Sequence, residues 1–300
     1  LPLPDGILIY PGHSQGSPCG LEIGHRPVTT LGYERLHNPY LQPQEKDDFC
    51  NFAQAAAPPL PPYFEKMHRV NAEGPAVLGH APELHPLSAS AFHHAVEEEG
   101  TILIDTRDMF AFGAGHIAGA LNLNAAPVMS LWGGWFIDPD KRILLIVDEH
   151  EKDNVVRYLW RTGFTNFAGY LEGGMSAWSS AGYPLQQIPQ RSVQQLREAG
   201  NNLQLVDVRS TAEYDQGYIP GAIHIPLARL LEQISKLNPE RATAVYCGGG
   251  YRASLATSLL RQHGFKNINN IPGSWKAWRE AGFPVAGVAH DTVCIPSVRI

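Results

Sequence analysis

The sequence predicts an α/β fold in which two tandem domains each consist of a parallel sheet flanked by helices. Two observations support this fold class. One unit occurs twice, because Asp105 and Arg107 recur at the same spacing as Asp207 and Arg209, and an Ala-Trp pair follows in each copy. Within each copy, short apolar runs alternate with stretches of helical spacing, the pattern of a parallel sheet covered by helices. Two copies indicate tandem domains and not a solenoid.

Six segments follow one another along the 300 residues, a length that suits about two domains of ordinary size. In order they are 1–75, which belongs to neither copy; 76–86, a linker; 87–186, the first copy; 187–190, a short polar linker; 191–288, the second copy; and 289–300, a tail.

Residues 1–75 contain separate structural signals. Gly6–His13 is expected to be a strand that runs into a tight turn and presents a histidine. Ser17–Gly20 follows, then a helical stretch that includes Gly32–Arg35, then the proline-rich Pro58–Phe64. Because the chain begins with a leucine inside a strand-like pattern, we expect it to be a piece of a longer protein.

The strands of the two copies are predicted from their apolar runs. Ile102–Asp105 matches Leu203–Asp207, and Arg142–Val147 matches the run that ends in Ala244–Tyr246. After that run, Ser254–His263 shows helical spacing, and Gly264 is its stop signal. Three tryptophans at helical spacing are expected in the cores; they are Trp178, Trp275 and Trp278.

Composition excludes several classes of protein. A hydrophobic content of 44% with 17% charged residues is typical of a globular chain. The net charge of −6 argues against nucleic acid as a partner, and no apolar run approaches the roughly 18 residues of a membrane span. The four cysteines are scattered without a CxxC pair, which favours a reducing compartment and a cytoplasmic location.

A cysteine loop carries the strongest functional signal. Cys247 directly follows a predicted strand and opens the sequence Cys-Gly-Gly-Gly-Tyr-Arg, which leads into a predicted helix. A glycine loop between a strand and a helix start forms a nest of backbone N–H groups at the positive end of the helix dipole. We expect such a nest to stabilise the thiolate and raise its nucleophilicity, so the chemistry is centred on sulfur. The alternative is that this cysteine is a small buried hydrophobe.

The first copy differs at the equivalent position. It has Asp148 where the second copy has Cys247, and the following residues 149–153 are acidic and lack glycine. An aspartate cannot form a covalent sulfur intermediate, and the acidic loop would repel an anionic substrate. We therefore expect the first copy to be catalytically silent, either as a scaffold that shields the second site or with a separate binding role.

Both copies resemble rhodanese domains, the sulfurtransferase module. The second copy has Asp207-Val208-Arg209, Gly217–Ala222, the cysteine loop and Gly273–Trp278, while the first retains Gly115–Ala120 and Gly173–Trp178. The second copy departs from the family pattern at Tyr218, where histidine is usual, and at His224, where asparagine is common.

This resemblance implies a mechanism and a set of site residues. The Cys247 thiolate would take a sulfur atom from thiosulfate or a small-molecule persulfide and pass it to a thiol or another acceptor. The backbone of Gly248, Gly249, Gly250, Tyr251 and Arg252 would cradle the anionic sulfur, and Arg252 would hold the loop and attract an anionic donor.

Other interpretations are left open by the residues. Related phosphatases have a longer loop between cysteine and arginine, so phosphatase or arsenate reductase activity is disfavoured. Asp207, Arg209 and Glu213 could act as acid and base, or Asp207 could end a strand beneath the loop while Arg209 and Glu213 form an ion pair. The chain could also be a non-catalytic module that docks a partner.

Residues 1–75 resemble the C-terminal end of a metallo-β-lactamase-fold domain, as found in persulfide dioxygenase–rhodanese fusion proteins. In that superfamily a histidine at the position of His13 can bind the second metal of a two-metal site. One histidine cannot hold iron or zinc tightly, and the thirteen histidines show no ligand spacing. We therefore expect no cofactor in this chain and place iron or zinc only in a complete metallo-β-lactamase-like domain. Pairing of such fusions into a homo-oligomer through the missing half is left open.

Overall fold

The computed structural model describes residues 2–13, 26–42, 45–56, 60–77 and 79–287. The features noted at Ser17–Gly20 and Pro58–Pro59, and the tail 289–300, lie outside the described residues. The chain divides into two compact units, Leu1–Leu60 and Pro61–Ile300, and each is described by itself. None of the helices in the described residues has both the length and the apolar composition of a membrane span.

The first unit pairs two short strands and carries two helices. Strand β1 (Leu8–Ile9) runs antiparallel to β2 (Thr29–Thr30), so the strand predicted over Gly6–His13 is much shorter, because its partner is only two residues long. The predicted helix around Gly32–Arg35 is confirmed as α1, which starts where the Thr30 side chain accepts a hydrogen bond from the Tyr33 N–H. The elements after β2 are α1 (Leu31–His37), the 3₁₀ turn η1 (Pro39–Leu41) and α2 (Lys46–Ala56).

Helix α3 (Tyr63–Glu73) belongs to the second unit. A side chain at Gly134 would place its Cβ 2.0 Å from the Tyr63 ring, so the ring packs directly on the glycine backbone. Residues 63–73 fall within the predicted segment 1–75, and the structure groups them with the repeats in the second unit.

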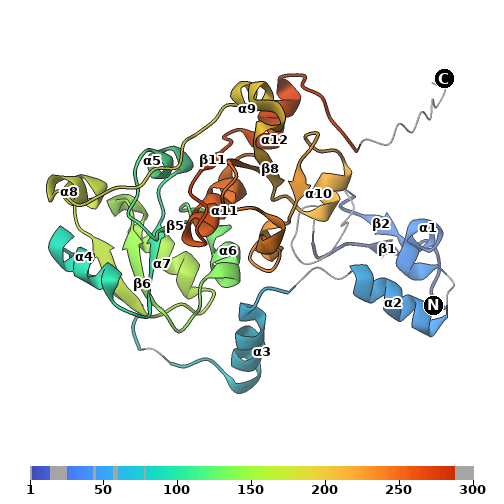
Figure 1. Ribbon diagram of the computed structural model, residues 1–300. Helices are drawn as coiled ribbons and strands as arrows, with labels where there is room; N and C mark the ends of the chain where they lie inside the picture. Colours follow the sequence, from blue (N-terminus) through green and yellow to red (C-terminus); the bar gives the residue numbers. More distant parts are fainter. Residues whose placement is uncertain (1, 14–25, 43–44, 57–59, 78, 288–300) are drawn as a thin grey trace. The chain divides into compact units, whose positions relative to one another are not determined.

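Repeat 1, the first of the two copies, is a five-stranded parallel sheet with helices on both faces (Figure 1). Its strand order is β3-β7-β6-β4-β5, with β6 in the middle. The strands are β3 (Pro86–Leu87), β4 (Thr101–Asp105), β5 (Leu121–Asn122), β6 (Arg142–Ile146) and β7 (Phe167–Leu171). The helices are α4 (Ala89–Glu97), α5 (Met109–Ala114), α6 (Met129–Phe136), η2 (Glu149–Glu151), α7 (Lys152–Trp160) and α8 (Gly174–Ser180).

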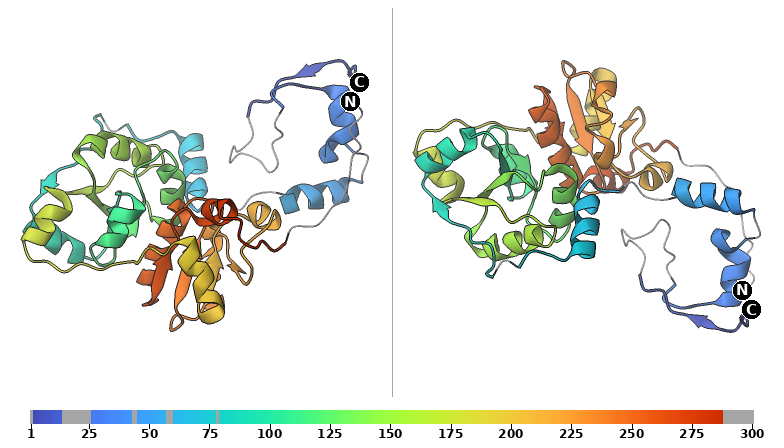
Figure 2. Two further views of the ribbon diagram at one scale, coloured as in Figure 1. Left: turned by 90° about the horizontal axis from the view of Figure 1, so that it is seen from above. Right: turned by 90° about the horizontal axis from the view of Figure 1, so that it is seen from below.

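Repeat 2, the second copy, has a four-stranded parallel sheet in the order β11-β10-β8-β9. It is the yellow-to-red part of the chain in Figure 2. Its strands are β8 (Gln204–Asp207), β9 (Ile223–His224), β10 (Thr243–Tyr246) and β11 (Ile268–Asn270). Its helices are α9 (Val193–Ala199), η3 (Gly200–Asn202), α10 (Thr211–Asp215), η4 (Leu227–Arg229), η5 (Ile234–Lys236), α11 (Tyr251–Gln262) and α12 (Ser274–Glu280). The predicted α/β class with parallel sheets is confirmed.

Alternating residues of each strand divide the interior into separate cores, as the two-residue period of a strand requires. In repeat 2, Tyr246 faces the core that contains the buried Trp278, whereas Val245 and Cys247 face the opposite one. Trp178 and Trp278 are buried as predicted, whereas Trp275 is only partly buried.

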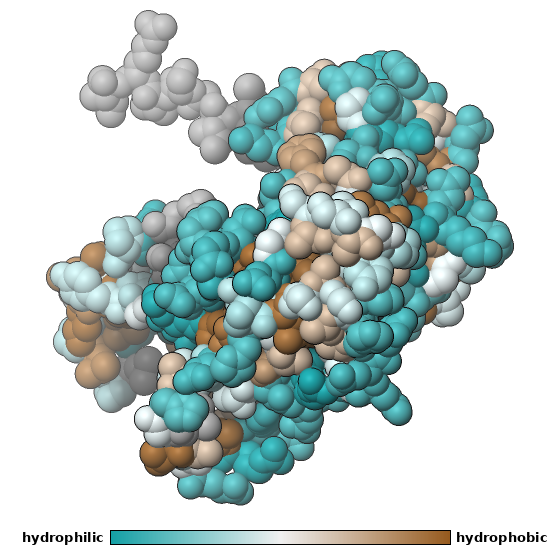
Figure 3. Space-filling model, turned by 90° about the vertical axis from the view of Figure 1, so that its left-hand side faces the viewer, coloured by the Kyte–Doolittle hydropathy of each residue, from teal (hydrophilic) through white to brown (hydrophobic). Residues whose placement is uncertain are grey.

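One core is common to both repeats, and helix α11 lies in it. Every residue from Ala253 to Leu260 is buried, and α11 contacts β5 of repeat 1 as well as its own sheet. The backbone N–H of Asn122 donates a hydrogen bond of 3.1 Å to the Ser258 hydroxyl, and the Ser254 hydroxyl donates to the Asn122 side chain. These buried bonds fix the position of α11 against repeat 1. On the face drawn in Figure 3, hydrophilic residues predominate and hydrophobic ones form small groups.

Candidate active site

Cys247 lies at the carboxyl end of β10, between the sheet of repeat 2 and helix α11. Its side chain is 1% exposed. The three glycines that follow form the loop, and Gly250 has a φ of 118°, a conformation that favours glycine. Helix α11 begins at Tyr251 and not at Ser254, so the predicted start was three residues late. Tyr251 and Arg252 therefore belong to the first turn of the helix and not to the loop.

Hydrogen bonds hold the loop from two sides. The backbone N–H of Gly250 donates to the Cys247 Sγ over 3.1 Å, so a main-chain donor of the loop points at the sulfur. From the other side, the N–H groups of Trp275 and Lys276 in α12 donate to the carbonyl oxygens of Cys247 and Gly248, over 2.9 and 3.1 Å. The start of α12 thus fixes the main chain on which the sulfur is mounted.

Ser274 makes a further contact with this loop that the sequence did not reveal. Its hydroxyl accepts a 3.1 Å hydrogen bond from the Cys247 N–H and donates one of 2.6 Å to the carbonyl of Ile271. Ser274 has a φ of 49°, and it is the one residue other than glycine with positive φ in the described part of the chain. This conformation costs about 1 kcal/mol or more for a residue with a side chain. The Ser274 hydroxyl therefore joins the backbone of Cys247 to that of Ile271.

Arg252 forms a two-pronged ion pair with Glu213. The two guanidinium nitrogens lie 2.6 and 2.7 Å from the two carboxylate oxygens, and Ser210 donates to the same carboxylate. Burial would raise the pKa of Glu213, but the hydrogen bonds and charge of Arg252 outweigh it and lower that pKa to about 2. Glu213 therefore stays ionised and balances the charge of Arg252.

Arg209 pairs with Asp207, and the predicted ion pair of Arg209 with Glu213 is wrong. The Arg209 Nη2 lies 2.6 Å from the Asp207 carboxylate, which is fully buried at the end of β8. Arg209 reaches Glu213 only through the main-chain carbonyl, at 3.2 Å, because the Glu213 carboxylate faces Arg252. The guanidinium also lies 4.4 Å from the centre of the Trp275 ring. Such a saturated pair is structural and is not arranged for acid–base work.

The two family departures, Tyr218 and His224, lie in one aromatic stack. Tyr214 separates them, with ring centres 4.0 Å from Tyr218 and 4.1 Å from His224. His224 Nε2 lies 3.0 Å from the Arg209 carbonyl. Neither residue is among those that line the cavity at Cys247.

A cavity of about 510 Å³ opens beside Cys247. Repeat 2 lines it with Cys247, Gly249, Tyr251 and Arg252, and repeat 1 lines it with four apolar side chains, Met109, Val128, Leu131 and Trp132. The Tyr251 hydroxyl donates to the Asn124 carbonyl of repeat 1 over 3.3 Å, and burial raises the pKa of that phenol. The candidate site is therefore assembled from both repeats, which the sequence did not reveal because the wall residues lie far from the cysteine along the chain.

The equivalent position of repeat 1 has no such arrangement. Asp148 is exposed and leads into the turn η2 instead of a glycine loop. Lys152 at the start of α7 forms an ion pair with Glu149 and donates to the Tyr170 hydroxyl over 3.1 Å. In the part of the chain that the structure describes, no backbone hydrogen bond joins α8 to residues 148–151.

The described residues do not fit an iron or zinc site. His13 is exposed, and nowhere in the described ranges do three or more histidine, cysteine or acidic side chains group as metal ligands.

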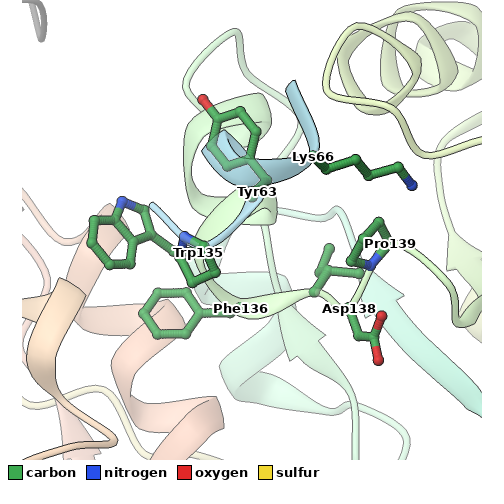
Figure 4. Close-up of a pocket in the computed structure, with 9 residues that line it drawn as sticks. Tyr63, Lys66, Trp135, Phe136, Asp138 and Pro139 are labelled. Atoms are coloured by element: carbon green, nitrogen blue, oxygen red, sulfur yellow. The ribbon is translucent and has the colours of Figure 1, made fainter. Parts of the chain in front are cut away.

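A second cavity, of about 320 Å³, lies between α3 and the end of α6; Tyr63, Lys66 and Trp135 are among its lining residues (Figure 4).

Known proteins resemble this chain over its two repeats. The family model for the rhodanese-like domain matches residues 88–181 and 190–281. A sulfurtransferase of Allochromatium vinosum is 31% identical over 99 residues, which are 33% of this chain and 92% of that protein. An HTH-type transcriptional regulator of Mycobacterium tuberculosis is 38% identical over 114 residues, which are 36% of this chain and 50% of the regulator.

Some of these similarities cover only part of the relative. The chain spans about half the length of the mycobacterial regulator and of a putative sulfur carrier protein of Bacillus subtilis. A crystal structure of a metallo-beta-lactamase from Staphylococcus aureus is 28% identical, with a TM-score of 0.45 over 57% of this chain and 46% of that one. With so low a TM-score, the resemblance of residues 1–75 to a metallo-β-lactamase fold stays a prediction.

Proposed function

Since this chain belongs to the family of rhodanese-like domains, we propose that it is a sulfurtransferase whose one competent site is Cys247 in repeat 2. The observation that carries the proposal is the geometry of the loop. A cysteine at the end of a central strand faces a cavity, and the N–H of Gly250 lies 3.1 Å from its sulfur. Main-chain donors of this kind stabilise negative charge on the reacting atom.

The reaction proceeds in two displacement steps. The Cys247 thiolate attacks the outer sulfur of thiosulfate, the S–S bond of the donor breaks, and sulfite leaves with the bonding electron pair. A new bond forms between the Cys247 sulfur and the transferred sulfur, which gives a Cys247 persulfide anion. An acceptor such as cyanide or a thiolate then attacks the outer sulfur and restores the cysteine thiolate, so no external oxidant or reductant is needed.

Arg252 acts mainly on the loop in this proposal. Its charge is balanced by Glu213, which lies 2.6 Å away, so it attracts an anionic donor less than a free guanidinium would. The ion pair instead links the first turn of α11 to α10, and this link holds Gly248 and Gly249 in place for the incoming sulfur. The neighbouring N–H groups of the loop complete the cradle once the outer sulfur is bound.

The cellular setting is also proposed. We place the chain within a larger sulfide- or persulfide-handling protein that joins a metallo-β-lactamase-like, metal-dependent half to the two repeats. Its partners would be small-molecule sulfur donors and thiol acceptors in the cytoplasm, with neither nucleic acid nor a membrane as a binding surface. The support is the resemblance of residues 1–75, the net charge of −6 and the scattered cysteines.

Thiocyanate production from thiosulfate and cyanide tests the proposal. The wild type should turn over, Cys247→Ser should show no turnover above background, and Cys50→Ser should match the wild type. Cys50 is a suitable control because it is the exposed free cysteine of the described chain. Turnover that survives in Cys247→Ser would exclude the proposed nucleophile.

A second candidate is the non-catalytic module, and the burial of Cys247 favours it. Because Cys247 is 1% exposed, a sulfur donor reaches it only through the cavity, and if no donor reaches the sulfur the cavity serves binding alone. The same assay separates the two functions, since a binding module produces no thiocyanate from any donor.

A further inference from the structure

We propose that repeat 1, although it lacks a cysteine, selects the substrate of repeat 2 through an apolar wall formed by Met109, Val128, Leu131 and Trp132. This wall favours sulfur donors that carry an apolar organic group next to the scissile S–S bond over inorganic thiosulfate. The inference rests on the proposed sulfurtransferase function and adds the chemical class of the donor.

The wall faces the cysteine loop at close range. A Cβ at Gly250 would lie 2.7 Å from both Sδ and Cε of Met109, so Met109 packs directly against the loop backbone. Leu131 and Trp132 lie in the first turn of α6 and Val128 is its N-cap residue, and the spacing of three and four residues places all three on one side. The wall therefore reaches the cysteine from two elements of repeat 1.

The position of the wall is fixed by the shared core. Met129, the neighbour of Val128, is fully buried in the cluster that also contains Leu255 and Leu259 of α11. The Asn122 hydrogen bonds to α11 and the contact of Tyr251 with Asn124 tie the same strand-to-helix segment to repeat 2. A substrate between the loop and the wall thus meets a preformed apolar surface.

Charge in the cavity points to the same donor class. Of the described residues that line the cavity, Arg252 is the one cation, and both of its terminal nitrogens donate hydrogen bonds to Glu213. The sulfonate end of thiosulfate would lose hydration against apolar side chains without gaining an unpaired cation, which is unfavourable. An aryl or alkyl group at the same place would bury apolar surface, which is favourable.

A thiosulfonate follows the same chemistry as thiosulfate and carries the organic group in the required place. The Cys247 thiolate attacks the terminal sulfur of R–SO₂–S⁻, the bond between the two sulfurs breaks, and the sulfinate R–SO₂⁻ leaves with the electron pair. The Cys247 persulfide is the same intermediate, and cyanide removes its outer sulfur as thiocyanate. Only the group R distinguishes the donors, so differences in rate between variants report on the wall.

The test measures kcat/KM for benzenethiosulfonate and for thiosulfate, with cyanide as the acceptor. In Trp132→Ala and Met109→Ala, the value for benzenethiosulfonate should fall about tenfold, as expected for loss of an apolar pocket contact, while that for thiosulfate changes less than about twofold. Trp135→Ala is the matched control, because Trp135 lies on the same helix but lines the other cavity. It should leave both values unchanged.

Binding provides a readout that does not depend on turnover. Benzenesulfinate, the product of the aryl donor, should bind Cys247→Ser more tightly than sulfite does, and adding Trp132→Ala should remove that difference. A ratio of the two kcat/KM values that is the same in wild type, Trp132→Ala and Met109→Ala would overturn the inference while Cys247 still transfers sulfur. Absence of turnover with every donor would overturn the proposed function instead, and the binding difference would still decide the role of the wall.

Discussion

The two repeats share a framework and differ where a reaction would take place. In both, an arginine after one strand binds the aspartate that ends it: Arg107 with Asp105, and Arg209 with Asp207. In both, the indole of a buried tryptophan donates to a proline carbonyl, over 3.1 Å in repeat 1 and 2.8 Å in repeat 2. After the equivalent strands β6 and β10, however, repeat 1 has an exposed aspartate and repeat 2 a buried cysteine.

This difference shows that the fold itself does not make the site. The strand end and the helix start are available in both repeats, but only repeat 2 adds the glycine loop and the hydrogen bonds from α12 that hold it. Repeat 1 instead contributes α5 and α6 to the wall of the cavity beside Cys247 in repeat 2. Function is thus carried by local groups placed on a common scaffold.

Exchanging the two residues at the strand ends is expected to have the largest effect. Cys247→Asp should lower kcat for thiocyanate formation at least about 1000-fold, as removal of a covalent nucleophile does. Adding Asp148→Cys to that variant should restore nothing, because residues 149–151 form a turn and lack the glycine nest. Steady-state assays with thiosulfate check both, and recovery of turnover in the double variant would mean that the strand end alone suffices.

Ser274 and its counterpart Gly174 offer a smaller but more informative exchange. Both have positive φ, at 49° and 57°, but only Ser274 has a hydroxyl that bonds to the cysteine N–H. Ser274→Gly should lower kcat/KM about tenfold while changing the free energy of unfolding by less than about 1 kcal/mol, because the released backbone strain offsets the two lost hydrogen bonds. Urea unfolding and thiocyanate assays measure the two quantities.

The reverse change is the control for this pair. Gly174→Ser introduces the strain into repeat 1 without a loop to bind, so the free energy of unfolding should fall by about 1 kcal/mol with kcat/KM unchanged. If Ser274→Gly destabilised the protein and left kcat/KM intact, the serine would be a structural residue only.

Removing the ion pair between Glu213 and Arg252 is expected to have the smallest effect of these changes. The effect is a loss of free energy of unfolding, and its size depends on pH. The pKa of Glu213 in the folded protein is about 2, below its ordinary value of 4.5. A lowered pKa means that the stabilisation is complete above about pH 5 and is lost as the pH falls from 4.5 towards 2. Glu213→Gln should therefore lower the free energy of unfolding by about 1 kcal/mol at neutral pH, and the difference from wild type should narrow below pH 4.5.

Urea unfolding of the two proteins between pH 8 and 3.5 gives this difference directly. A gap between wild type and Glu213→Gln that stays constant over the whole range would show that the charge of Glu213 is not what stabilises the loop.

Much of the fold and the core of the site could be predicted because their signals are local. The cysteine loop, its glycines and the aspartate that replaces the cysteine in repeat 1 are short motifs, and the internal repeat aligns them with each other. The start of α11 was placed three residues late because Gly250 caps the helix without a side chain, whereas a sequence usually signals a helix start by a capping side chain.

The features that were missed depend on contacts between distant segments. Nothing in residue spacing joins Met109 or Trp132 to Cys247, since they meet only when α11 packs against repeat 1. Likewise Arg209 and Arg252 both lie within reach of Glu213, and only the direction of its carboxylate shows which of them it pairs with. Ser274 is the exception among the missed residues. Repeat 2 has Gly273-Ser274 where repeat 1 has Gly173-Gly174, and this local difference was a signal that pointed to Ser274.

The most direct test of the difference between the repeats is intact-mass spectrometry of the wild type after thiosulfate or glutathione persulfide, before and after cyanide. We predict a gain of one sulfur atom that cyanide removes, that maps to the peptide containing Cys247, and that Cys247→Ser never shows. No gain from either donor, or a gain confined to another cysteine, would contradict the account of repeat 2 as the sulfur-carrying site.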